Sequence, residues 1–554
     1  MSIFSFSDDE ELSSQDIENF LKPLSLDDST LYELSCRLAT VYHTLALTGD
    51  GHFFPTPVTR LPSGGETGFY LAVDVGVTNL RVGFIELLGE PENEYDQPSS
   101  ILRKNAIPQV ISHRRVRRTI EKAWRIEERL KQDPPEALFS WIGSCIAEVV
   151  ADELSSHAAE IPSTLNTGLS FSLPMMQKSL DEATLMPIGK GFAIKSNLDL
   201  RQVLLAGYEC HSGRRDNEQE QFSKRRKLYA LPKLNIVAIT NDTVATLVSL
   251  AYSVKSLPNT RVVMGIVVGT GCNATIPMKL SDLHQTKVRQ IHSYNPAATE
   301  GIISTEWTLQ GTEAPLHELG IFTNWDAELD AHSPRPGFQP FEYMTGARFI
   351  GELVRLISYD YFTNIAAFSP AVLPVALTRP YMLTTAFVSD IIARSRSDSE
   401  LAVHLNRKLP GPVSNIWTWT PSSARVLRAT AAAVQTRSAA LIAAASVGLL
   451  ACNHEIHLSR PRTSLPTVYS DAVSSSLCIP KSASWHRGPE ELVVAYSGGI
   501  IQHYPNFKEL CQGYIDRLVI RAGPQDGGKS VLLREASDGS IIGAGVLAGM
   551  VAAS

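Results

Sequence analysis

Apolar residues recur at helical spacing in several parts of the chain. Residues from about 16 to 47 show this pattern and predict leading helices. In the later segment ALFSWIGSCIAEVVADEL, the spacing of Leu138, Ile142 and Ile146 places all three on one face of a helix. The segment DGSIIGAGVLAGMVAAS at the end of the chain predicts a turn followed by a helix of small residues.

Short apolar runs between the helical segments are typical of strands. The run LNTGLSFSLP predicts a strand that ends at Pro174, and LNIVAITNDTVATLVSLAY predicts a buried strand that runs into a helix. The run RVVMGIVVGTGCNATI predicts two strands joined by a glycine turn. Polar residues in 211–230 and the Ser- and Pro-rich region 457–488 predict exposed loops. Strands that alternate with helices in this way favour an α/β fold.

The segment AVDVGVTNLRVG, residues 72–83, predicts two strands joined by a tight turn. Asp74 ends the first strand, and the turn presents Thr78 and Asn79. Such a turn can offer backbone N–H groups and a hydroxyl to a phosphate, although an ordinary hairpin gives the same pattern. Val77 stands where a phosphate-binding turn usually has glycine, so this segment by itself leaves both interpretations open.

Four other polar features have a structural interpretation as well as a chemical one. Asn241 and Asp242 lie between a strand and a helix, where such residues commonly cap the helix. The glycines of VVGTGCNA are compatible with a simple hairpin turn. Glu306 and Glu342 could be surface carboxylates. None of these features identifies a catalytic site alone.

Composition narrows the class of protein. The chain has 554 residues, 44% of them hydrophobic and 19% charged, which predicts a globular protein of more than one domain. Its net charge of -7 gives no general argument for nucleic-acid binding. The 7 cysteines form no CxxC pair, so neither a disulfide framework nor a zinc site is implied. The acidic N-terminus lacks a targeting pattern and no apolar run is long enough for a bilayer, so we expect a soluble intracellular protein without membrane attachment.

Taken in order, these segments resemble the hexokinase family from about Leu31 to Ala552. LPSGGETGFYLAVDVGVTNLRVG is similar to the segment that leads into the family's phosphate motif D-x-G-G-T-N-x-R, and SFSLPMMQKSLDEATLMPIGKGF resembles its sugar-binding segment. VAITNDTVATLVSLAY, GIVVGTGCNA and LDAHSPRPGFQPFEYMTGARFIGELVRLI are also close to the family form. The resemblance implies a two-lobed hexokinase/actin-like ATPase fold, in which ribonuclease H-like lobes are built on mixed sheets flanked by helices.

We expect three parts on this basis. The first is an N-terminal helical lead, 1–69. A small lobe follows at 70–229 and is completed by the C-terminal helix at 541–554. The large lobe comprises 230–540, and the resemblance places the substrate cleft between the two lobes.

The resemblance also implies a hexose, glucose foremost, as substrate. It gives Asp242 the role of general base for the primary hydroxyl of the sugar and makes Lys190 a second catalytic residue. A carboxylate within reach of this hydroxyl can take its proton during phosphoryl transfer. The implied sugar-binding residues are Ser172, Lys190, Asn241, Asp242, Asn273, Glu306 and Glu342.

ATP and Mg²⁺ are the cofactors that the resemblance implies. Asp74 would hold the magnesium ion through water, and Thr78 and Thr270 would line the phosphates. The implied nucleotide-binding residues are Asp74, Gly76, Thr78, Asn79, Arg81, Thr270, Gly271, Gly498 and Gly499.

The chain departs from the family pattern mainly on the nucleotide side. Val77 replaces the second glycine of the phosphate turn, and Ile541 and Ile542 occupy places that the family fills with small residues. We expect Val77 to stiffen the turn and hinder its closure on a phosphate, and we expect Ile541 and Ile542 to crowd the nucleotide. Ser497 begins a Ser-Gly-Gly in place of the family's D-G-S, a change that we expect to be mild. On the sugar side, Gly189 stands where the family usually has threonine.

Two functional hypotheses follow. One is an active ATP-dependent hexose 6-phosphotransferase of carbohydrate metabolism. The nearly complete set of sugar-binding residues favours this hypothesis. The other is a regulatory protein like the atypical hexokinase-like proteins of fungi, with an eroded nucleotide site. Such a protein binds hexose in the cleft, or merely keeps the fold, and signals through protein partners. Loss of two or three phosphate contacts at about 2–4 kcal/mol each would lower the rate by many orders of magnitude. We favour the regulatory hypothesis for that reason.

Basic residues in the predicted loop suggest a location beyond the cytoplasm. Arg214 and Arg215 precede the cluster of Lys224, Arg225, Arg226 and Lys227, and HRRVRR at 113–118 adds a second basic stretch. Nuclear import receptors bind such clusters, although a solvated loop balanced by its own acidic residues has the same composition. The sequence therefore predicts a cytoplasmic protein with access to the nucleus.

Overall fold

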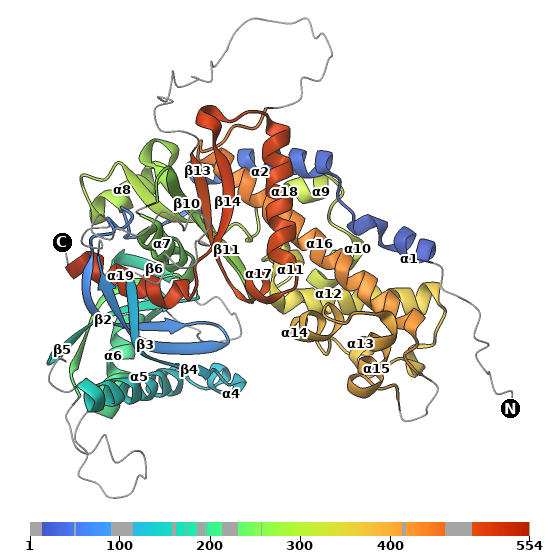
Figure 1. Cartoon of the computed structure of the whole chain (residues 1–554), viewed down its shortest axis with the longest axis horizontal. Coiled ribbons are helices and arrows are strands. Elements are labelled where there is room, and N and C mark those ends of the chain that lie inside the picture. The colour runs from blue at the N-terminus through green and yellow to red at the C-terminus, as the bar shows by residue number, and fades with distance from the viewer. Residues whose placement is uncertain are drawn as a thin grey trace, which may run out of the picture.

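The computed structural model shows two large sheets with helices between them and around them, and a third, small sheet of three strands (Figure 1). It describes residues 14–48, 51–89, 115–157, 162–173, 175–185, 194, 197–212, 231–255, 257–412, 417–459 and 490–552. The α/β class that the sequence predicts is confirmed, because both large sheets are built from strands that alternate with helices, apart from a helical stretch at 314–452.

One sheet has five strands in the order β4-β3-β2-β5-β9. Strands β2, β5 and β9 are parallel, whereas β3 and β4 run antiparallel to their neighbours. The AVDVGVTNLRVG segment forms the β2–β3 hairpin, in which Asp74 pairs with Arg81 across the strands. The strands are β2 (Thr67–Val75), β3 (Asn79–Leu88), β4 (Val116–Arg125), β5 (Thr164–Phe171) and β9 (Lys233–Thr240).

Alternate residues of β2 enter two different cores. Leu71 and Val73 pack in the core that also contains buried residues of α5 (Pro135–His157) and α6 (Leu200–Ser212). Tyr70 and Ala72 pack in a second core with α7 (Asp242–Val254) and α19 (Gly539–Ala552). A strand buried on both faces has no need for the alternation of polar and apolar residues, which explains its continuous apolar run.

The other sheet has six strands in the order β1-β12-β11-β10-β13-β14. One face shares the core of α7 and α19, and the other face packs in a large core with α2 (Asp28–Leu47), α16 (Pro421–Cys452) and α18 (Phe507–Ala522). The strands are β1 (Phe54–Pro55), β10 (Thr260–Val268), β11 (Cys272–Lys279), β12 (Glu300–Ser304), β13 (Glu491–Ser497) and β14 (Ser530–Glu535).

Helices α7 and α19 lie side by side between the two sheets (Figure 1). Their close packing depends on glycine, because a Cβ at Gly543 would lie 2.1 Å from the carbonyl oxygen of Ala245. On the sheet side, a Cβ at Gly168 would lie 1.9 Å from the carbonyl oxygen of Ala544. The small residues of the C-terminal segment therefore let its helix approach both neighbours.

The remaining elements surround these layers. Helix α16 is long and apolar enough to cross a membrane, but 89% of its most apolar window is buried inside the protein, as expected for a core helix. The other elements are α1 (Ser14–Leu21), α4 (Glu128–Gln132), β6 (Met175–Ser179), β7 (Glu182–Leu185), β8 (Leu198–Asp199), α8 (Gln285–Tyr294), α9 (Ala314–Glu318), α10 (Asn324–Ala331), α11 (Pro340–Thr345), α12 (Ala347–Asp360), α13 (Val375–Thr378), α14 (Thr385–Phe387), α15 (Asp398–Lys408) and α17 (Gly499–His503).

The sheets divide the chain somewhat differently from the three parts that the sequence suggests. Strand β9 lies beyond residue 230 and yet belongs to the five-stranded sheet. Helix α2 and strand β1 lie before residue 70 and pack with the six-stranded sheet and its helices. Most of the two predicted loops, 213–230 and 460–488, lies outside the described residues.

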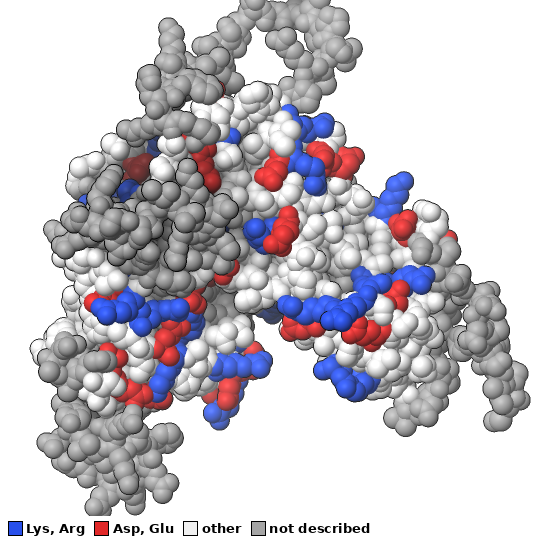
Figure 2. Space-filling model, in the orientation of Figure 1, with Lys and Arg blue, Asp and Glu red and all other residues white. Residues whose placement is uncertain are grey.

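The described surface carries charges of both signs. Figure 2 shows Lys and Arg side chains interspersed with Asp and Glu on the face that it displays. Part of the HRRVRR stretch is described, and its arginines are engaged within the fold. Arg115 is buried and donates to the carbonyl oxygen of Gly64, and Arg117 forms an ion pair with Glu86.

Candidate active site

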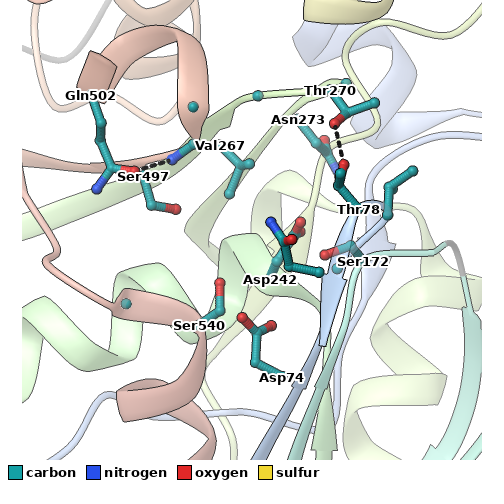
Figure 3. A pocket seen from close by; sticks show the side chains of 18 of the residues that line it. Asp74, Thr78, Ser172, Asp242, Val267, Thr270, Asn273, Ser497, Gln502 and Ser540 are labelled. Atoms are coloured by element: carbon teal, nitrogen blue, oxygen red, sulfur yellow. Dashed lines mark hydrogen bonds between the residues drawn. The ribbon is translucent and has the colours of Figure 1, made fainter. Parts of the chain in front are cut away.

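A cavity of about 520 Å³ lies where turns from both sheets meet the start of α19. The β2–β3 turn lines it from the five-stranded sheet, and the β10–β11 turn lines it from the six-stranded sheet. Figure 3 shows Asp74, Asp242 and Ser540 on one side of this cavity and Thr270 and Asn273 on another. The cavity thus gathers side chains that are up to several hundred residues apart in sequence.

Asp74 lies at the carboxyl end of β2, and only 8% of its surface is exposed. Burial raises its pKa to about 7, with Arg81 opposing the shift and the nearby Asp242 carboxylate adding to it. Its Oδ1 has no hydrogen-bond partner within the described part of the chain. A buried carboxylate oxygen without a partner, close to a second carboxylate, is a chemically suitable place for a hydrated Mg²⁺.

The turn after Asp74 closes although it contains Val77. The backbone N–H of Gly76 donates to the carbonyl oxygen of Asn79 at 2.9 Å, and Val77 does not adopt a positive φ. The hairpin conformation therefore does not require glycine at this position. Thr78 Oγ1 lies 3.5 Å from Thr270 Oγ1, so the turns of the two sheets touch at this point (Figure 3).

Asn241 and Asp242 both cap a helix and line the cavity. Oδ1 of Asn241 accepts hydrogen bonds from N and Oγ1 of Thr243, at 2.8 and 2.7 Å, at the start of α7. The helix capping that the sequence suggested is therefore present, and it fixes Asp242 at the first position of the helix. Thr246 Oγ1 donates to the carbonyl oxygen of Asp242 and lies 2.8 Å from Ser497 Oγ. This chain of hydroxyls connects Asp242 to the glycine turn after β13.

Asn273 and Glu306 form a buried hydrogen-bonded pair. Nδ2 of Asn273 donates to Oε1 of Glu306 at 2.7 Å and to Ser304 Oγ at 3.2 Å. Ser304 Oγ also donates to Oε1 of Glu306, at 3.0 Å. Glu306 adopts a positive φ of 51°, which is uncommon for a residue with a side chain and is stabilised here by its backbone hydrogen bond to Oδ1 of Asn273.

Glu342 has a different place from the other described sugar-site candidates. Its Oε2 accepts a hydrogen bond from the backbone N–H of Cys272 at 3.0 Å, and its side chain does not line the cavity. A Cβ at Gly271 would lie 2.7 Å from this oxygen, so the turn can pack on the carboxylate only with glycine there. Glu342 thus supports the β10–β11 turn from behind.

The opposite end of the cavity is formed by the turn between β13 and α17. Gly498 has a φ of 112°, and a Cβ there would lie 2.5 Å from the carbonyl oxygen of Val268, so this turn requires glycine. Gln502 accepts a hydrogen bond from the Gly498 N–H at 3.1 Å and donates to Glu535 at 3.0 Å. Glycine N–H groups in such turns are suited to bind phosphate oxygens.

The charges of the cavity wall are mainly negative. Arg81 is the one Lys or Arg among the described residues that line it, and it donates to Glu121 and to Asp538. The acidic side chains of this wall are Asp74, Asp242, Glu306, Glu535 and Asp538. The site therefore has little positive charge of its own for a polyphosphate.

The expectation that both isoleucines of the last helix crowd the cavity is not met. Ile541 is fully buried in the core between the sheets, and Ile542 packs against the same core. Neither lines the cavity, whereas Gly539 and Ser540 do. The first turn of α19 directs residues 541 and 542 toward α7 and the sheets, because successive helical residues point about 100° apart. Of the three branched departures, only Val77 lines the cavity, and Ser497, which stands where the family has aspartate, lines it as well.

The structure brings most of the predicted site together. Lys190 and its neighbour Gly189 lie outside the described residues, so their predicted roles stay predictions. Several cavity residues were not selected from the sequence, because they lie in ordinary polar stretches, and only the folded chain shows that they face the cavity. The predicted residues that line it are Asp74, Gly76, Thr78, Asn79, Arg81, Ser172, Asn241, Asp242, Thr270, Gly271, Asn273, Glu306, Gly498 and Gly499, and the additional ones include Gln502, His503, Glu535, Ser537, Asp538 and Ser540.

Comparison with solved structures defines the class of fold. The hexokinase from Schistosoma mansoni complexed with glucose is similar over 97% of this chain and 98% of its own, with a TM-score of 0.67 and 22% identity. A second solved hexokinase is similar over 97% of this chain and 99% of its own, with a TM-score of 0.63 and 21% identity. The predicted two-lobed, actin-like ATPase fold is thereby confirmed.

Sequence models of protein families then identify the family of this chain. Hexokinase models match residues 16–252 and 263–550, and the chain belongs to the hexokinase family. Hexokinase-1 of Schizosaccharomyces pombe is 30% identical over 322 residues, which is 58% of this chain and 55% of the relative. Hexokinase-9 of Oryza sativa subsp. japonica is 25% identical over 500 residues, which is 90% of this chain and 82% of the relative. ATP and Mg²⁺ are the cofactors that the family uses in general.

Proposed function

We propose that this protein binds a hexose in the cleft between its two sheets and has weak or no ATP-dependent phosphotransfer, so that sugar occupancy serves regulation. The contrast between the two ends of the cavity carries this proposal. The sugar end retains a connected set of polar side chains, whereas the described part of the phosphate end has one arginine, which is already engaged by two carboxylates.

The sugar end is suited to hydroxyl groups. Asn273 and Glu306 are buried and held by each other and by Ser304. Asn241 is fixed by its role as a helix cap, with the amide oxygen occupied by Thr243. Amides and carboxylates held in fixed positions can bind a ring of hydroxyls with little loss of side-chain entropy.

The phosphate end is poorly matched to a triphosphate. The carboxylates of Glu121 and Asp538 compete with phosphate for the Arg81 guanidinium. Asp74 and Asp242 fit a hydrated Mg²⁺, which would supply the charge that stabilises the transferred phosphoryl group when bound. Asp242 would then accept the proton of the sugar hydroxyl as general base, if transfer occurs.

A second candidate is an active hexose 6-phosphotransferase. Two observations favour it: Ile541 and Ile542 lie outside the cavity, and the Val77 turn closes with ordinary backbone geometry. On this view Val77 is the remaining obstacle on the nucleotide side, and its effect on turnover is one of degree.

One pair of measurements separates the candidates. Glucose and fructose binding is measured by calorimetry without nucleotide, and turnover is measured in a coupled assay with MgATP. Sugar binding without turnover supports the regulatory proposal, sugar binding with turnover supports the kinase, and the absence of sugar binding contradicts both.

We also propose that the protein enters the nucleus through the basic cluster Lys224, Arg225, Arg226 and Lys227, which lies outside the described residues. The second basic stretch, 113–118, gives little support, since Arg115 is buried and Arg117 is paired with Glu86. A regulator that reports hexose occupancy would act through protein partners, and access to the nucleus would allow it to act on gene expression.

A further inference from the structure

Four charged side chains form a closed ring beside the phosphate end of the cavity. Arg81 donates to Oε1 of Glu121 at 2.8 and 3.0 Å and to Oδ1 of Asp538. Arg118 donates to the other oxygens of the same two carboxylates, Oε2 of Glu121 at 3.0 Å and Oδ2 of Asp538 at 2.6 Å. Each carboxylate therefore bridges both guanidinium groups, and the net charge of the ring is zero.

The ring connects the five-stranded sheet to the start of α19. Arg81 lies on β3, Arg118 and Glu121 lie on β4, and Asp538 immediately precedes α19 with a φ of 54°. Burial alone would raise the pKa of Asp538, but the charges of Arg81 and Arg118 and their hydrogen bonds lower it below its ordinary value. The Asp538 carboxylate is therefore ionised at neutral pH.

Only part of the ring faces the cavity. Arg81 and Asp538 line it, whereas Arg118 and Glu121 stand behind them. A phosphate that approaches Arg81 also approaches the Asp538 carboxylate. The repulsion from Asp538 depends on how far Arg118 neutralises it, although Arg118 itself does not reach the cavity.

We propose that Arg118 is a positioning residue for the phosphate end of the cleft, where it balances Asp538 and Glu121 and so keeps the Arg81 guanidinium available to a bound polyphosphate. This inference rests on the form of the proposed function in which weak phosphotransfer remains, because it requires that the cleft admits a phosphoryl donor. It assigns a function to a residue of the HRRVRR stretch, whose basic composition predicted only a role in nuclear import.

The test changes the net charge of the ring in both directions and measures MgATP binding by calorimetry at saturating glucose. Asp538→Asn gives the ring a charge of +1 and should tighten MgATP binding by about 3- to 10-fold, because it removes a carboxylate that repels phosphate. Asparagine also tolerates a positive φ, so the backbone at this position should be preserved. Arg118→Gln gives the opposite charge and should weaken binding by about the same factor. The double variant restores neutrality and should bind like the unchanged protein. Arg118→Lys keeps the charge and should retain most of the affinity.

Arg117→Gln is the matched control. Arg117 is the adjacent residue of β4, pairs with Glu86 and makes no contact with the ring, so its replacement changes the total charge equally. It should leave MgATP affinity unchanged. If MgATP binding to the unchanged protein is below detection, the Arg118 effect is measured by comparing Asp538→Asn with the double variant.

Two outcomes would overturn the inference. One is equal MgATP affinity of Asp538→Asn and the double variant, and the other is failure of Asp538→Asn to bind MgATP more tightly than the unchanged protein. Glucose titrations on the same samples, with thermal unfolding to verify folding, report separately on the proposed function. If the unchanged protein does not bind glucose, the proposed function is contradicted. If it binds glucose but the ring variants do not change MgATP affinity, only the role of Arg118 is contradicted.

Discussion

The amide of Asn273 donates a hydrogen bond to the carboxylate of Glu306 at 2.7 Å, and the backbone N–H of Glu306 returns a bond of 3.1 Å to the amide oxygen of Asn273. This reciprocal pair joins the start of β11 to the segment that follows β12 and holds two polar side chains at the cavity wall. Its geometry makes the sugar end of the cleft the part of the site that can be tested most directly.

Replacing Glu306 with alanine should weaken glucose binding. The change leaves the Asn273 amide with a lost partner in a buried site, which costs about 1–3 kcal/mol, or about 5- to 150-fold in Kd. Calorimetric glucose titration measures the loss. Glu300→Ala is the control, because Glu300 lies exposed at the start of β12, the strand that precedes Glu306. Equal glucose affinity of Glu306→Ala and the unchanged protein would remove Glu306 from the site.

Replacing Asp242 with asparagine should abolish whatever phosphotransfer the protein has. Asparagine keeps the shape at the start of α7 but cannot accept the hydroxyl proton, and loss of a general base costs about 100-fold or more in rate. The readout is glucose 6-phosphate formation at saturating MgATP. Glucose affinity should change much less than the rate. A variant that retains the full rate would exclude Asp242 as the base.

The raised pKa of Asp74 predicts that the stability of the folded protein depends on pH in an unusual direction. Burial raises its pKa to about 7, so the folded protein loses stability as the pH rises from the ordinary carboxyl range to about 7. Asp74→Asn removes this cost. Its melting temperature should equal that of the unchanged protein near pH 4 and exceed it by about 3 °C or more at pH 8. Mg²⁺ at pH 8 should stabilise the unchanged protein more than the variant, and a constant difference across pH would contradict the assignment.

Val77 and Ile541 should respond differently to substitution. Val77 lines the cavity, so Val77→Gly should tighten MgATP binding by about 3- to 10-fold through closer backbone approach. Ile541 is fully buried away from the cavity, so Ile541→Ala should lower stability by about 2–5 kcal/mol without improving MgATP binding. Tighter nucleotide binding by a folded Ile541→Ala protein would return this residue to the nucleotide site.

Nuclear import should depend on the cluster Lys224, Arg225, Arg226 and Lys227. A fluorescent fusion of the full chain is expected in the cytoplasm and the nucleus, and replacement of all four residues by alanine should exclude it from the nucleus. The control replaces Arg117 and Arg118, which are paired with carboxylates of the fold. A nuclear signal that is insensitive to the four alanines would exclude this mechanism.

The order of the chemical motifs and much of the fold could be predicted from the amino-acid sequence. The β2–β3 hairpin, the strand that runs into α7 and the small-residue helix α19 were all predicted, because their signals are local: apolar runs, glycine turns and helix caps. The resemblance to a known family supplied the two-lobed fold and most of the residues that line the cavity.

The tertiary structure alone decided which way the side chains of these motifs point. Ile541 faces the core rather than the nucleotide, Glu342 lies behind a turn rather than in the cavity, and Arg118 reaches a carboxylate 420 residues further along the chain. Sequence spacing fixes orientation only within one helix or strand. At a helix end or between two sheets, the direction in which a side chain points depends on how distant segments pack. In this protein the close approach of α19 to α7 and β5 sets that packing.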